Sequence, residues 1–144
     1  MRLLIERVKE ASCKIDNIVK SSISKGFLTY VCFEEGDDIN KINKAVYKLS
    51  KLRIFEDDNH KMNLSIEDIN GEILIISSFS LYADALSGNR PSFSRSLTYN
   101  KSIELYNLFI ENAKKILKIK TGEFGADMEI SAINDGPVSI ILDI

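Results

Sequence analysis

Three serines lie close together in the segment Ser77-Ser78-Phe79-Ser80, directly after the apolar run 73–76. A serine hydroxyl becomes a nucleophile when a neighbouring base takes its proton, and backbone N–H groups at a strand exit can form an oxyanion hole. No Gly-x-Ser-x-Gly pattern surrounds these serines, and the single histidine, His60, lies in the polar stretch 57–61, where an exposed turn residue is expected. The residues alone therefore favour hydrogen-bonding serines at a strand end and leave open an oxyanion hole made of N–H groups.

The segment Asn134-Asp135-Gly136-Pro137 lies between two apolar stretches near the carboxyl end of the sequence. Asp-Gly is a strong turn signal, so the residues alone favour a plain hairpin turn. Pro137 is unusual at this place, because proline removes a backbone donor where the next strand begins. The alternative is a fixed Gly136–Pro137 peptide, including the cis form open to X-Pro bonds, that presents its carbonyl oxygens rigidly to a ligand.

Two further loops carry residue types that bind nucleotides. Arg90, in the loop Ser87-Gly88-Asn89-Arg90-Pro91, could hold a phosphate, but the loop lacks the glycine pattern and the Lys-Ser/Thr of a P-loop. A solvent-exposed surface loop is the simpler interpretation. Phe124 and Met128 flank the flexible spot Gly125-Ala126, where either side chain could stack on a base, although such residues more often belong to the core.

Hydrophobic periodicity predicts the elements that must position these loops. Apolar residues recur at steps of three and four over 39–52 and over 103–117, which predicts two amphipathic helices, and Asp38 is a suitable N-cap for the first. Polar runs at 20–26 and 53–71 predict a turn and an irregular segment. The predicted strands cover residues 3–8, 12–19, 27–33, 73–76, 128–133 and 138–142.

The order β-β-β-α-β-α-β-β of these predicted elements indicates an α+β fold. We expect a single domain over residues 1–144, in which the strands form one curved mixed sheet or partial barrel covered by two amphipathic helices. A chain of 144 residues with 44% hydrophobic and 28% charged residues can bury a core of its own.

The charge of the chain limits its partners. Nineteen basic and 21 acidic residues give a formal charge of -2, whereas extensive nucleic-acid binders are usually strongly basic. Any RNA contact is therefore expected to be a local patch or a short RNA end. No stretch reaches the roughly 18 apolar residues of a membrane span, and the charged start 1–8 does not fit a signal peptide, so we expect a cytoplasmic protein with no membrane partner.

Neither the cysteines nor the histidine predict a metal or cofactor site. Cys13 and Cys32 lie in apolar, strand-like segments without Cys-x-x-Cys spacing, which is typical of buried reduced thiols. A single histidine makes a His-rich metal site impossible. We therefore expect no cofactor and no metal.

Six segments together resemble the D-aminoacyl-tRNA deacylase family, in family order and spacing, along the whole chain. The segment Ser77-Ser78-Phe79-Ser80-Leu81 resembles the family's Ser-Gln-Phe-Thr-Leu signature. The six segments are 1–8, 52–63, 77–84, 90–94, 121–128 and 134–139. The resemblance implies a hydrolase that cuts the ester bond between a D-amino acid, or glycine, and its tRNA, with no DNA among its partners.

The resemblance also implies a homodimer in which Gly136 and Pro137, joined by a cis peptide, enter the partner subunit's active site. Their parallel carbonyl oxygens would capture the amino group of the substrate, and Arg7 would help hold this motif in place. An L-residue would drive its Cβ into the Gly-Pro backbone, a D-residue would point away, and glycine has nothing to reject. Selection by exclusion of this kind is a known route to specificity.

Catalysis in the resembled family is attributed largely to the terminal ribose 2′-OH of the RNA. The resemblance places the catalytic segment at Ser77, Ser78, Phe79 and Ser80, with N–H donors around Phe79 and Ser80. Phe124 and Met128 would border the pocket for the terminal adenosine. Such a site needs no histidine, in keeping with the lack of a credible protein base in this sequence.

Two departures from the family signature affect this expectation. The family has glutamine where Ser78 stands and threonine where Ser80 stands. Ser80 keeps the hydroxyl, whereas Ser78 lacks the reach and the amide of glutamine. A role carried by main-chain N–H groups is unaffected by either change, and Ser139 in place of a common threonine is conservative.

Three alternatives remain open at this point. One is a related deacylase with a trans Gly-Pro peptide and a tolerance for small L-residues. Another is a non-catalytic module that binds an RNA end or a nucleotide. The third is an interaction protein whose loops are only turns.

Overall fold

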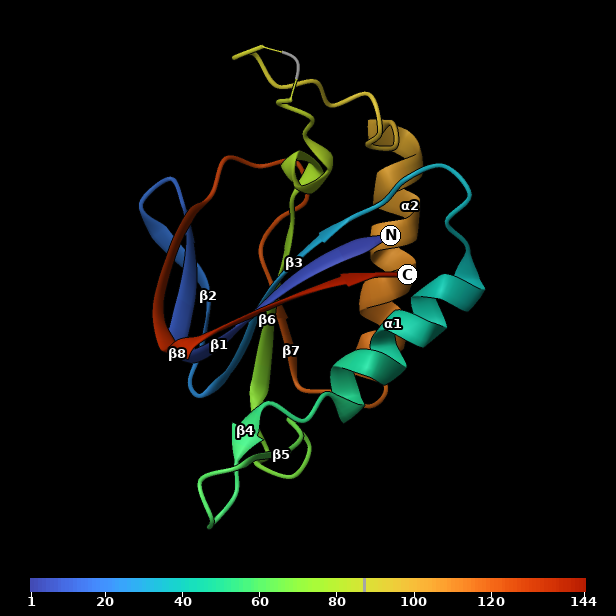
Figure 1. Cartoon of the computed structure of the whole chain (residues 1–144). Coiled ribbons are helices and arrows are strands. Elements are labelled where there is room, and N and C mark those ends of the chain that lie inside the picture. The colour runs from blue at the N-terminus through green and yellow to red at the C-terminus, as the bar shows by residue number, and fades with distance from the viewer. Residues whose placement is uncertain (87) are drawn as a thin grey trace.

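The computed structural model describes residues 1–86 and 88–144. Figure 1 shows a twisted sheet with two helices on one side, a small hairpin at one end and a long loop at the other. The elements in chain order are β1 (Arg2–Ile15), β2 (Ile18–Ile23), β3 (Gly26–Cys32), α1 (Ile39–Lys51), β4 (Phe55–Glu56), β5 (Met62–Leu64), β6 (Glu72–Ser77), the 3-10 helix η1 (Phe79–Tyr82), α2 (Tyr99–Lys114), β7 (Ile119–Thr121) and β8 (Glu129–Asp143).

The main sheet is mixed and is organised around β1. Its order is β2-β1-β3-β6-β7. The strand β8 pairs with β1 along the edge of β1 that β2 and β3 leave free. The strands β1, β2, β3 and β8 pair antiparallel, whereas β3 and β6, and β6 and β7, pair parallel. Parallel pairs need crossover connections, which α1 and α2 supply.

The sheet curves until β2 approaches β7 and nearly closes a barrel. The hydroxyl of Ser21 on β2 donates to the carbonyl of Thr121 on β7 at 2.9 Å. Next to it, Lys20 pairs with Glu123 at 3.1 Å. The predicted single α+β domain with a curved mixed sheet or partial barrel and two helices is therefore confirmed.

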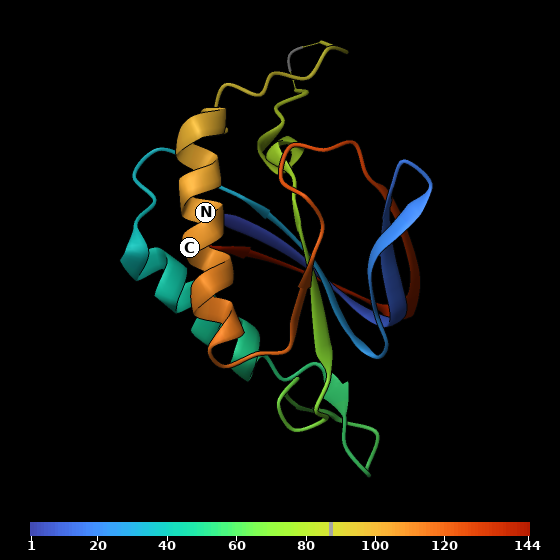
Figure 2. The same ribbon diagram turned by 180° about the vertical axis from the view of Figure 1, so that it is seen from behind.

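Both helices cover one face of the sheet, as the two opposite views show (Figures 1 and 2). Asp38 caps α1 as predicted, because its carboxylate accepts from the backbone N–H groups of Asn40 and Lys41 at 3.0 Å. The helices bury Leu49 and Phe109 against Phe27 and Ile73 of the sheet. A second, smaller core fills the inner side of the curved sheet; it contains Val8, Ala11, Cys13, Ile23, Leu28, Leu74 and Ile76.

The chain termini lie side by side between the helices and the sheet (Figures 1 and 2). The amino terminus donates to the carbonyl of Ile144 at 2.9 Å and pairs with the buried carboxylate of Asp37 at 2.6 Å. No helix in the described ranges 1–86 and 88–144 is long and apolar enough to cross a bilayer.

Several predicted boundaries in the first half of the chain are wrong. Residues 3–8 and 12–15 of the two predicted strands belong to one strand, β1; the chain then turns at Asp16 and Asn17, both with positive φ, and residues 18–19 begin β2. The run 20–26, predicted as a turn, contains most of β2, because alternate polar residues of an edge strand face solvent. The segment 53–71, predicted as irregular, contains the β4–β5 hairpin, whose tip carries the exposed His60.

The second half differs in two places. The second helix begins at Tyr99 and ends at Lys114, four residues earlier at its start and three earlier at its end than the predicted 103–117. The closing strands predicted at 128–133 and 138–142 are one strand, β8. Both halves of β8 pair with the same long neighbour, β1, so no hairpin separates them.

Candidate active site

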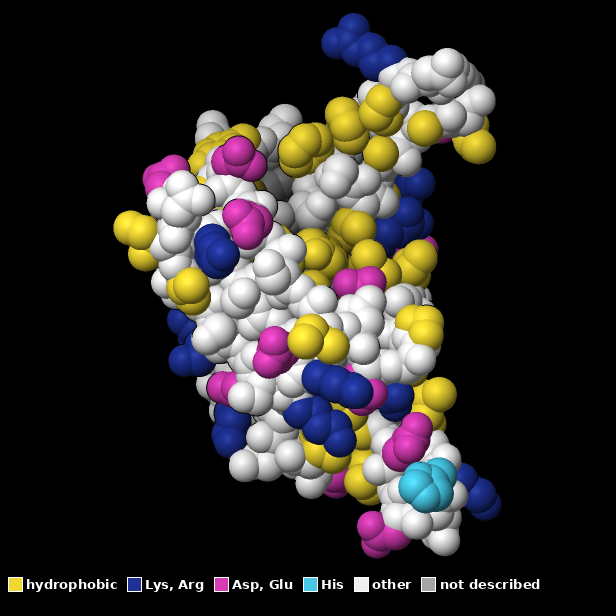
Figure 3. Space-filling model, turned by 90° about the vertical axis from the view of Figure 1, so that its left-hand side faces the viewer, with side chains coloured by type: hydrophobic (Ala, Val, Ile, Leu, Met, Phe, Trp, Pro, Cys, Tyr) yellow, Lys and Arg dark blue, Asp and Glu magenta, His cyan; other side chains and the backbone are white. Residues whose placement is uncertain are grey.

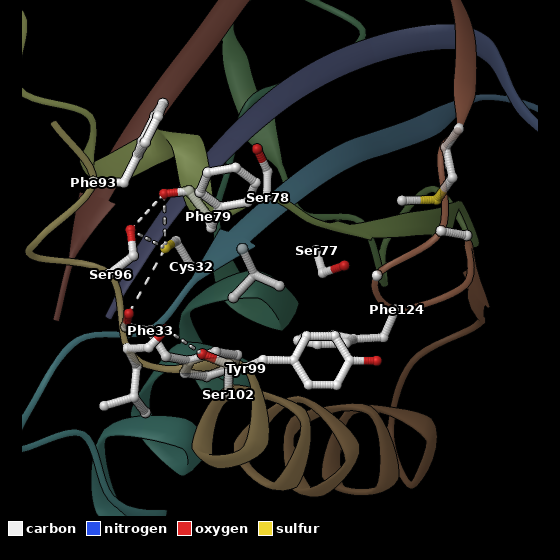
Figure 4. A pocket seen from close by; sticks show the side chains of 15 residues that line it. Cys32, Phe33, Ser77, Ser78, Phe79, Phe93, Ser96, Tyr99, Ser102 and Phe124 are labelled. Carbon is white, nitrogen blue, oxygen red and sulfur yellow. Dashed lines mark hydrogen bonds between the residues drawn. The ribbon is translucent and has the colours of Figure 1, made fainter. Parts of the chain in front are cut away.

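A pocket of about 450 Å³ opens where β3 and β6 end, next to the start of α2 (Figure 4). This volume suits a ligand the size of a nucleoside. Its lining is Val31, Cys32, Phe33, Ser77, Ser78, Phe79, Phe93, Ser96, Leu97, Tyr99, Ser102, Phe124, Gly125, Ala126 and Met128. The walls are mainly apolar and aromatic, and serine hydroxyls supply most of the polar groups.

The end of β6 delivers the serine segment to this pocket. Ser77 is the last residue of β6, and the N–H of Ser78 still donates to the carbonyl of Val31 on β3 at 2.9 Å. The chain then turns into η1, so Phe79 and Ser80 leave the sheet ladder. Among the described residues, neither the Phe79 N–H nor the Ser80 N–H has a protein acceptor. These two amides are therefore free donors beside the pocket.

The hydroxyls of Ser78 and Ser80 form a pair of their own, with 3.0 Å between the two oxygens. Ser80 is exposed and does not line the pocket, whereas Ser78 does. A short Ser78 side chain therefore still serves as a hydrogen-bonding partner for Ser80. The side chain of Ser77 points into the pocket (Figure 4).

Aromatic rings and a thioether form the opposite wall. Phe124 packs edge-on against Tyr99, with 5.3 Å between ring centroids, and lies 5.2 Å from the Tyr106 ring. Gly125 has φ +78 and leaves room for the Tyr99 ring, which an added Cβ would approach to 2.8 Å. Tyr106 is buried behind this wall and donates to the carbonyl of Ile75, and burial raises the pKa of its phenol.

The long loop between η1 and α2 closes the remaining side of the pocket. Phe93 packs edge-on against Phe79 with 4.9 Å between centroids. The Ser96 hydroxyl donates to the Phe79 carbonyl at 2.6 Å, beside the buried thiol of Cys32 (Figure 4). Burial raises the pKa of this thiol, so Cys32 is protonated at neutral pH and is not poised as a nucleophile.

Ion pairs and a buried tyrosine hold the base of this loop. Tyr82 donates to one carboxylate oxygen of Glu34 at 2.9 Å, and Arg95 donates to the other at 3.1 Å. The guanidinium groups of Arg2 and Arg95 lie 4.9 and 4.8 Å from the centroid of the Tyr82 ring. The loop tip around Arg90 is exposed, in keeping with the predicted surface loop; Ser87 lies outside the described residues.

Gly136 and Pro137 lie in a wide bulge of β8. In the pairing with β1, Arg7 alone stands opposite the four residues 135–138, so this part of β8 is displaced from the ladder. The plain hairpin turn predicted for 134–137 is therefore wrong. Gly136 and Pro137 are exposed, Gly136 has φ +138, and the peptide bond between them is cis.

Arg7 holds the base of this bulge. It is 5% exposed, and its guanidinium donates to the carbonyl of Asp135 at 2.9 Å and to that of Ile54 at 2.7 Å. The Asp135 carboxylate lies 3.3 Å from the same guanidinium. Arg7 and Asp135 line a second cavity with Lys9, Lys25, Phe55 and Glu56, apart from the first pocket.

The predicted site residues thus fall into two groups within one chain. Ser77, Ser78, Phe79, Phe124 and Met128 line a single pocket, although long stretches of sequence separate them. Ser80 lies beside that pocket. Arg7, Gly136 and Pro137 form the second group, at the bulge of β8.

Sequence reasoning missed several lining residues. Ser96, Tyr99 and Ser102 follow the Arg90 loop, and only proximity to the aromatic Phe93 could have drawn attention to them. Cys32 was predicted to be a buried thiol, which is confirmed, but not to touch this pocket.

Within the described part of the chain, no group of three or more His, Cys, Asp or Glu residues could hold a metal ion.

Comparison with known proteins gives matches along nearly the whole chain. Residues 4–143 match the family described as D-Tyr-tRNA(Tyr) deacylase. A D-aminoacyl-tRNA deacylase of Lactobacillus gasseri is 49% identical over 100% of both chains. One of Finegoldia magna is 46% identical over 99% of this chain and 97% of its own.

The fold is similar to that of a solved structure named c-Myc DNA Unwinding Element Binding Protein. The TM-score is 0.94 at 33% sequence identity, covering 100% of this chain and 99% of the other. The match of residues 4–143, the identities near one half and the shared fold all lead to the same assignment. The chain belongs to the D-Tyr-tRNA(Tyr) deacylase family.

Proposed function

We propose that this protein hydrolyses the ester bond of D-aminoacyl-tRNA and releases the free D-amino acid and tRNA. The observation that carries the proposal is the gathering of Ser77, Ser78 and Phe79 with Phe124 and Met128 in one nucleoside-sized pocket of a chain that matches the family over residues 4–143. The terminal adenosine enters between the Phe124 wall and the serine segment. The ester then lies next to the free amides of Phe79 and Ser80.

In this proposal the protein supplies position and hydrogen-bond donors, and the substrate supplies its own hydroxyl. Attack of water on the ester carbonyl develops negative charge on its oxygen, which the free N–H groups of Phe79 and Ser80 stabilise. The terminal ribose 2′-OH assists in activating the water. Among the residues that the structure describes, the pocket lining includes no histidine, aspartate or glutamate that would compete for that role.

Selectivity comes from the bulge of a second subunit in this proposal. In one chain, Gly136 and Pro137 are exposed and lie apart from the pocket, so they are available to enter the pocket of a partner. The edge strand β8 also exposes Ile133 and Ile141, at 52% and 62%. Figure 3 shows hydrophobic side chains on this face of the molecule. Exposed apolar residues on a long edge strand favour association with another copy.

The carbonyl oxygens of Gly136 and Pro137 then receive the amino group of the aminoacyl ester. The side chain of an L-residue collides with this backbone, a D-residue points outward, and glycine fits without a side chain. Arg7 supports the exclusion, because its bonds to Asp135 and Ile54 fix the bulge on the body of the subunit. The proposal therefore includes cleavage of glycyl-tRNA.

Deacylation of matched D-tyrosyl-, L-tyrosyl- and glycyl-tRNA by the purified protein tests this function. Rapid loss of the D-ester with the L-ester intact is the expected result. Failure to cleave any of the three above a buffer control would exclude the catalytic proposal and favour a binding module for RNA ends. Equal cleavage of the D- and L-esters would keep the hydrolase and exclude the selectivity mechanism.

We expect Ser80→Ala to lower turnover by about tenfold or less, a smaller loss than any enlargement of Gly136 produces. The Ser80 hydroxyl bonds Ser78, whereas the Ser80 N–H remains in the variant. Single-turnover deacylation of D-tyrosyl-tRNA measures the effect, with Ser78→Ala as the matched variant of the same hydroxyl pair. Complete loss of turnover with intact substrate binding would instead identify Ser80 as a nucleophile.

A further inference from the structure

Two side chains that can donate a hydrogen bond, from separate parts of the fold, lie against the carbonyl of Phe79. The Ser96 hydroxyl, from the loop before α2, donates to it at 2.6 Å, a short distance for an O–H···O bond. The sulfur of Cys32, at the end of β3, lies 3.5 Å from the same oxygen, 3.7 Å from the Ser96 hydroxyl and 3.7 Å from the Phe33 carbonyl, and its single proton is shared among these acceptors. Cys32 is 4% exposed, so it supports this arrangement from the buried side.

Fixing this carbonyl fixes the direction of the next amide. A peptide unit is planar and trans, so the N–H of Ser80 points opposite to the C=O of Phe79. Because Ser96 and Cys32 hold the oxygen on the protein side, the Ser80 N–H turns away from them and keeps no protein acceptor among the described residues.

The backbone of Phe79 and Ser80 also belongs to the 3-10 helix η1, in which the Leu81 N–H donates to the Ser78 carbonyl at 3.3 Å and the Ala83 N–H donates to the Ser80 carbonyl at 3.0 Å. The Phe79 ring is 63% exposed and touches only the edge of Phe93 among the aromatic residues. The last link of this segment to the sheet is one residue earlier, where the Ser78 N–H donates to the Val31 carbonyl. The Ser96 and Cys32 contacts therefore add to η1 in fixing the orientation of the Phe79–Ser80 peptide, and they are its contacts with the neighbouring loop and with β3.

Ser96 is itself held in place from both sides. Its own N–H donates to the Phe93 carbonyl at 3.0 Å, and the N–H of Leu97 donates to the Phe33 carbonyl at 2.9 Å. Arg95 pairs with Glu34 at 3.1 Å. A donor fixed in this way can hold an amide in the orientation that a reaction requires.

We propose that Ser96, supported by Cys32, is a positioning residue that orients the Phe79–Ser80 peptide so that the Ser80 N–H faces the reacting ester. The inference rests on the proposed function, because the ester is the group that this amide meets. Ser96 acts through Phe79 and has no direct part in the chemistry.

The test compares Ser96→Ala with Ser96→Thr, which keeps the hydroxyl, and with Ser94→Ala, an exposed serine of the same loop. For D-tyrosyl-tRNA we expect Ser96→Ala to lower kcat about tenfold and to leave KM within about twofold, since a misaligned donor affects the transition state most. Ser96→Thr restores most of kcat, Ser94→Ala leaves it unchanged, and Cys32→Ala causes a smaller loss because a thiol is a weak donor.

A second readout does not depend on activity. In the unliganded protein, the 13C resonance of the Phe79 carbonyl and the 15N–1H resonance of Ser80 should move in Ser96→Ala and return towards the original positions in Ser96→Thr. An unchanged kcat in Ser96→Ala, or a rise in KM alone, overturns the inference. If the unaltered protein cleaves no aminoacyl-tRNA, the proposed function fails separately, and unchanged resonances in Ser96→Ala still overturn the positioning role.

Discussion

Gly136→Ala is expected to lower kcat/KM for D-tyrosyl-tRNA by about 100-fold or more, since displacement of a substrate-positioning group by roughly 1 Å can have an effect of that size. The φ of Gly136 is +138, which L-residues rarely adopt. An added Cβ would also lie 2.8 Å from both the Cγ2 and the backbone N of Val138, and 3.5 Å from the Arg7 guanidinium. The bulge must therefore move, and with it the carbonyl oxygens proposed to receive the amino group.

Gly36→Ala is the matched control for this variant. Gly36 also has a positive φ, +84, but nothing lies within 4 Å of an added Cβ. It should lose about 1 kcal/mol of stability and keep its activity. Steady-state deacylation, with light scattering to follow the mass of the particle, separates the outcomes. A fully active Gly136→Ala protein would exclude a role for this motif at the substrate, whereas full activity of a monomer would exclude the cross-subunit arrangement.

The sequence was sufficient for the fold class because its strongest patterns are local. The apolar steps at 39–52 reflect a helix that packs one face on the sheet, and α1 occupies nearly the same residues. The strand predicted at 73–76 corresponds to β6, because an apolar run of that length is typical of a strand buried on both faces.

The errors came from long-range pairing. The Asp-Gly signal at 135–136 predicts a turn wherever it stands, and only the pairing of both halves of β8 with β1 converts it into a bulge. The polar run of β2 likewise became a strand because β1 extends far enough to pair with it. Local residue preferences carry no information about the length of a distant neighbour.

Prediction of the candidate site is limited in the same way, because local sequence does not show which distant residues meet. Residue types and the family resemblance identified the segment 77–80 and the pair Phe124 and Met128. The fold places all of these around one pocket except Ser80, which lies beside it. Ser96 and Cys32 could not be found in this way, because each is an ordinary residue in isolation. Their relevance depends on meeting at one carbonyl oxygen, from elements 64 residues apart in sequence.

Gly26→Ala is expected to destabilise the protein by about 3 kcal/mol or more, because the new methyl group has no space and its neighbour is backbone. An added Cβ at Gly26 would lie 1.8 Å from the carbonyl oxygen of Glu72. This contact is at the start of the parallel pairing of β3 with β6, where Gly26 stands opposite Glu72. The strands must separate or shift there, although Gly26 lies at the opposite end of β6 from the serine segment.

Chemical denaturation monitored by circular dichroism measures this loss, again with Gly36→Ala as the control, since that site tests the same substitution in open space. If the Gly26 variant folds, its kcat at a temperature well below the transition should remain close to that of the unaltered protein. The reason is that the register from Phe27 to Val31 can persist and still place Ser77 and Ser78 at the pocket.

A stability equal to that of the control would show that β3 and β6 are not held as closely at Glu72 as the structure places them. A stable protein without activity would show that a shift at Gly26 travels along β6 to the site, and would make the register of β6 itself a determinant of catalysis.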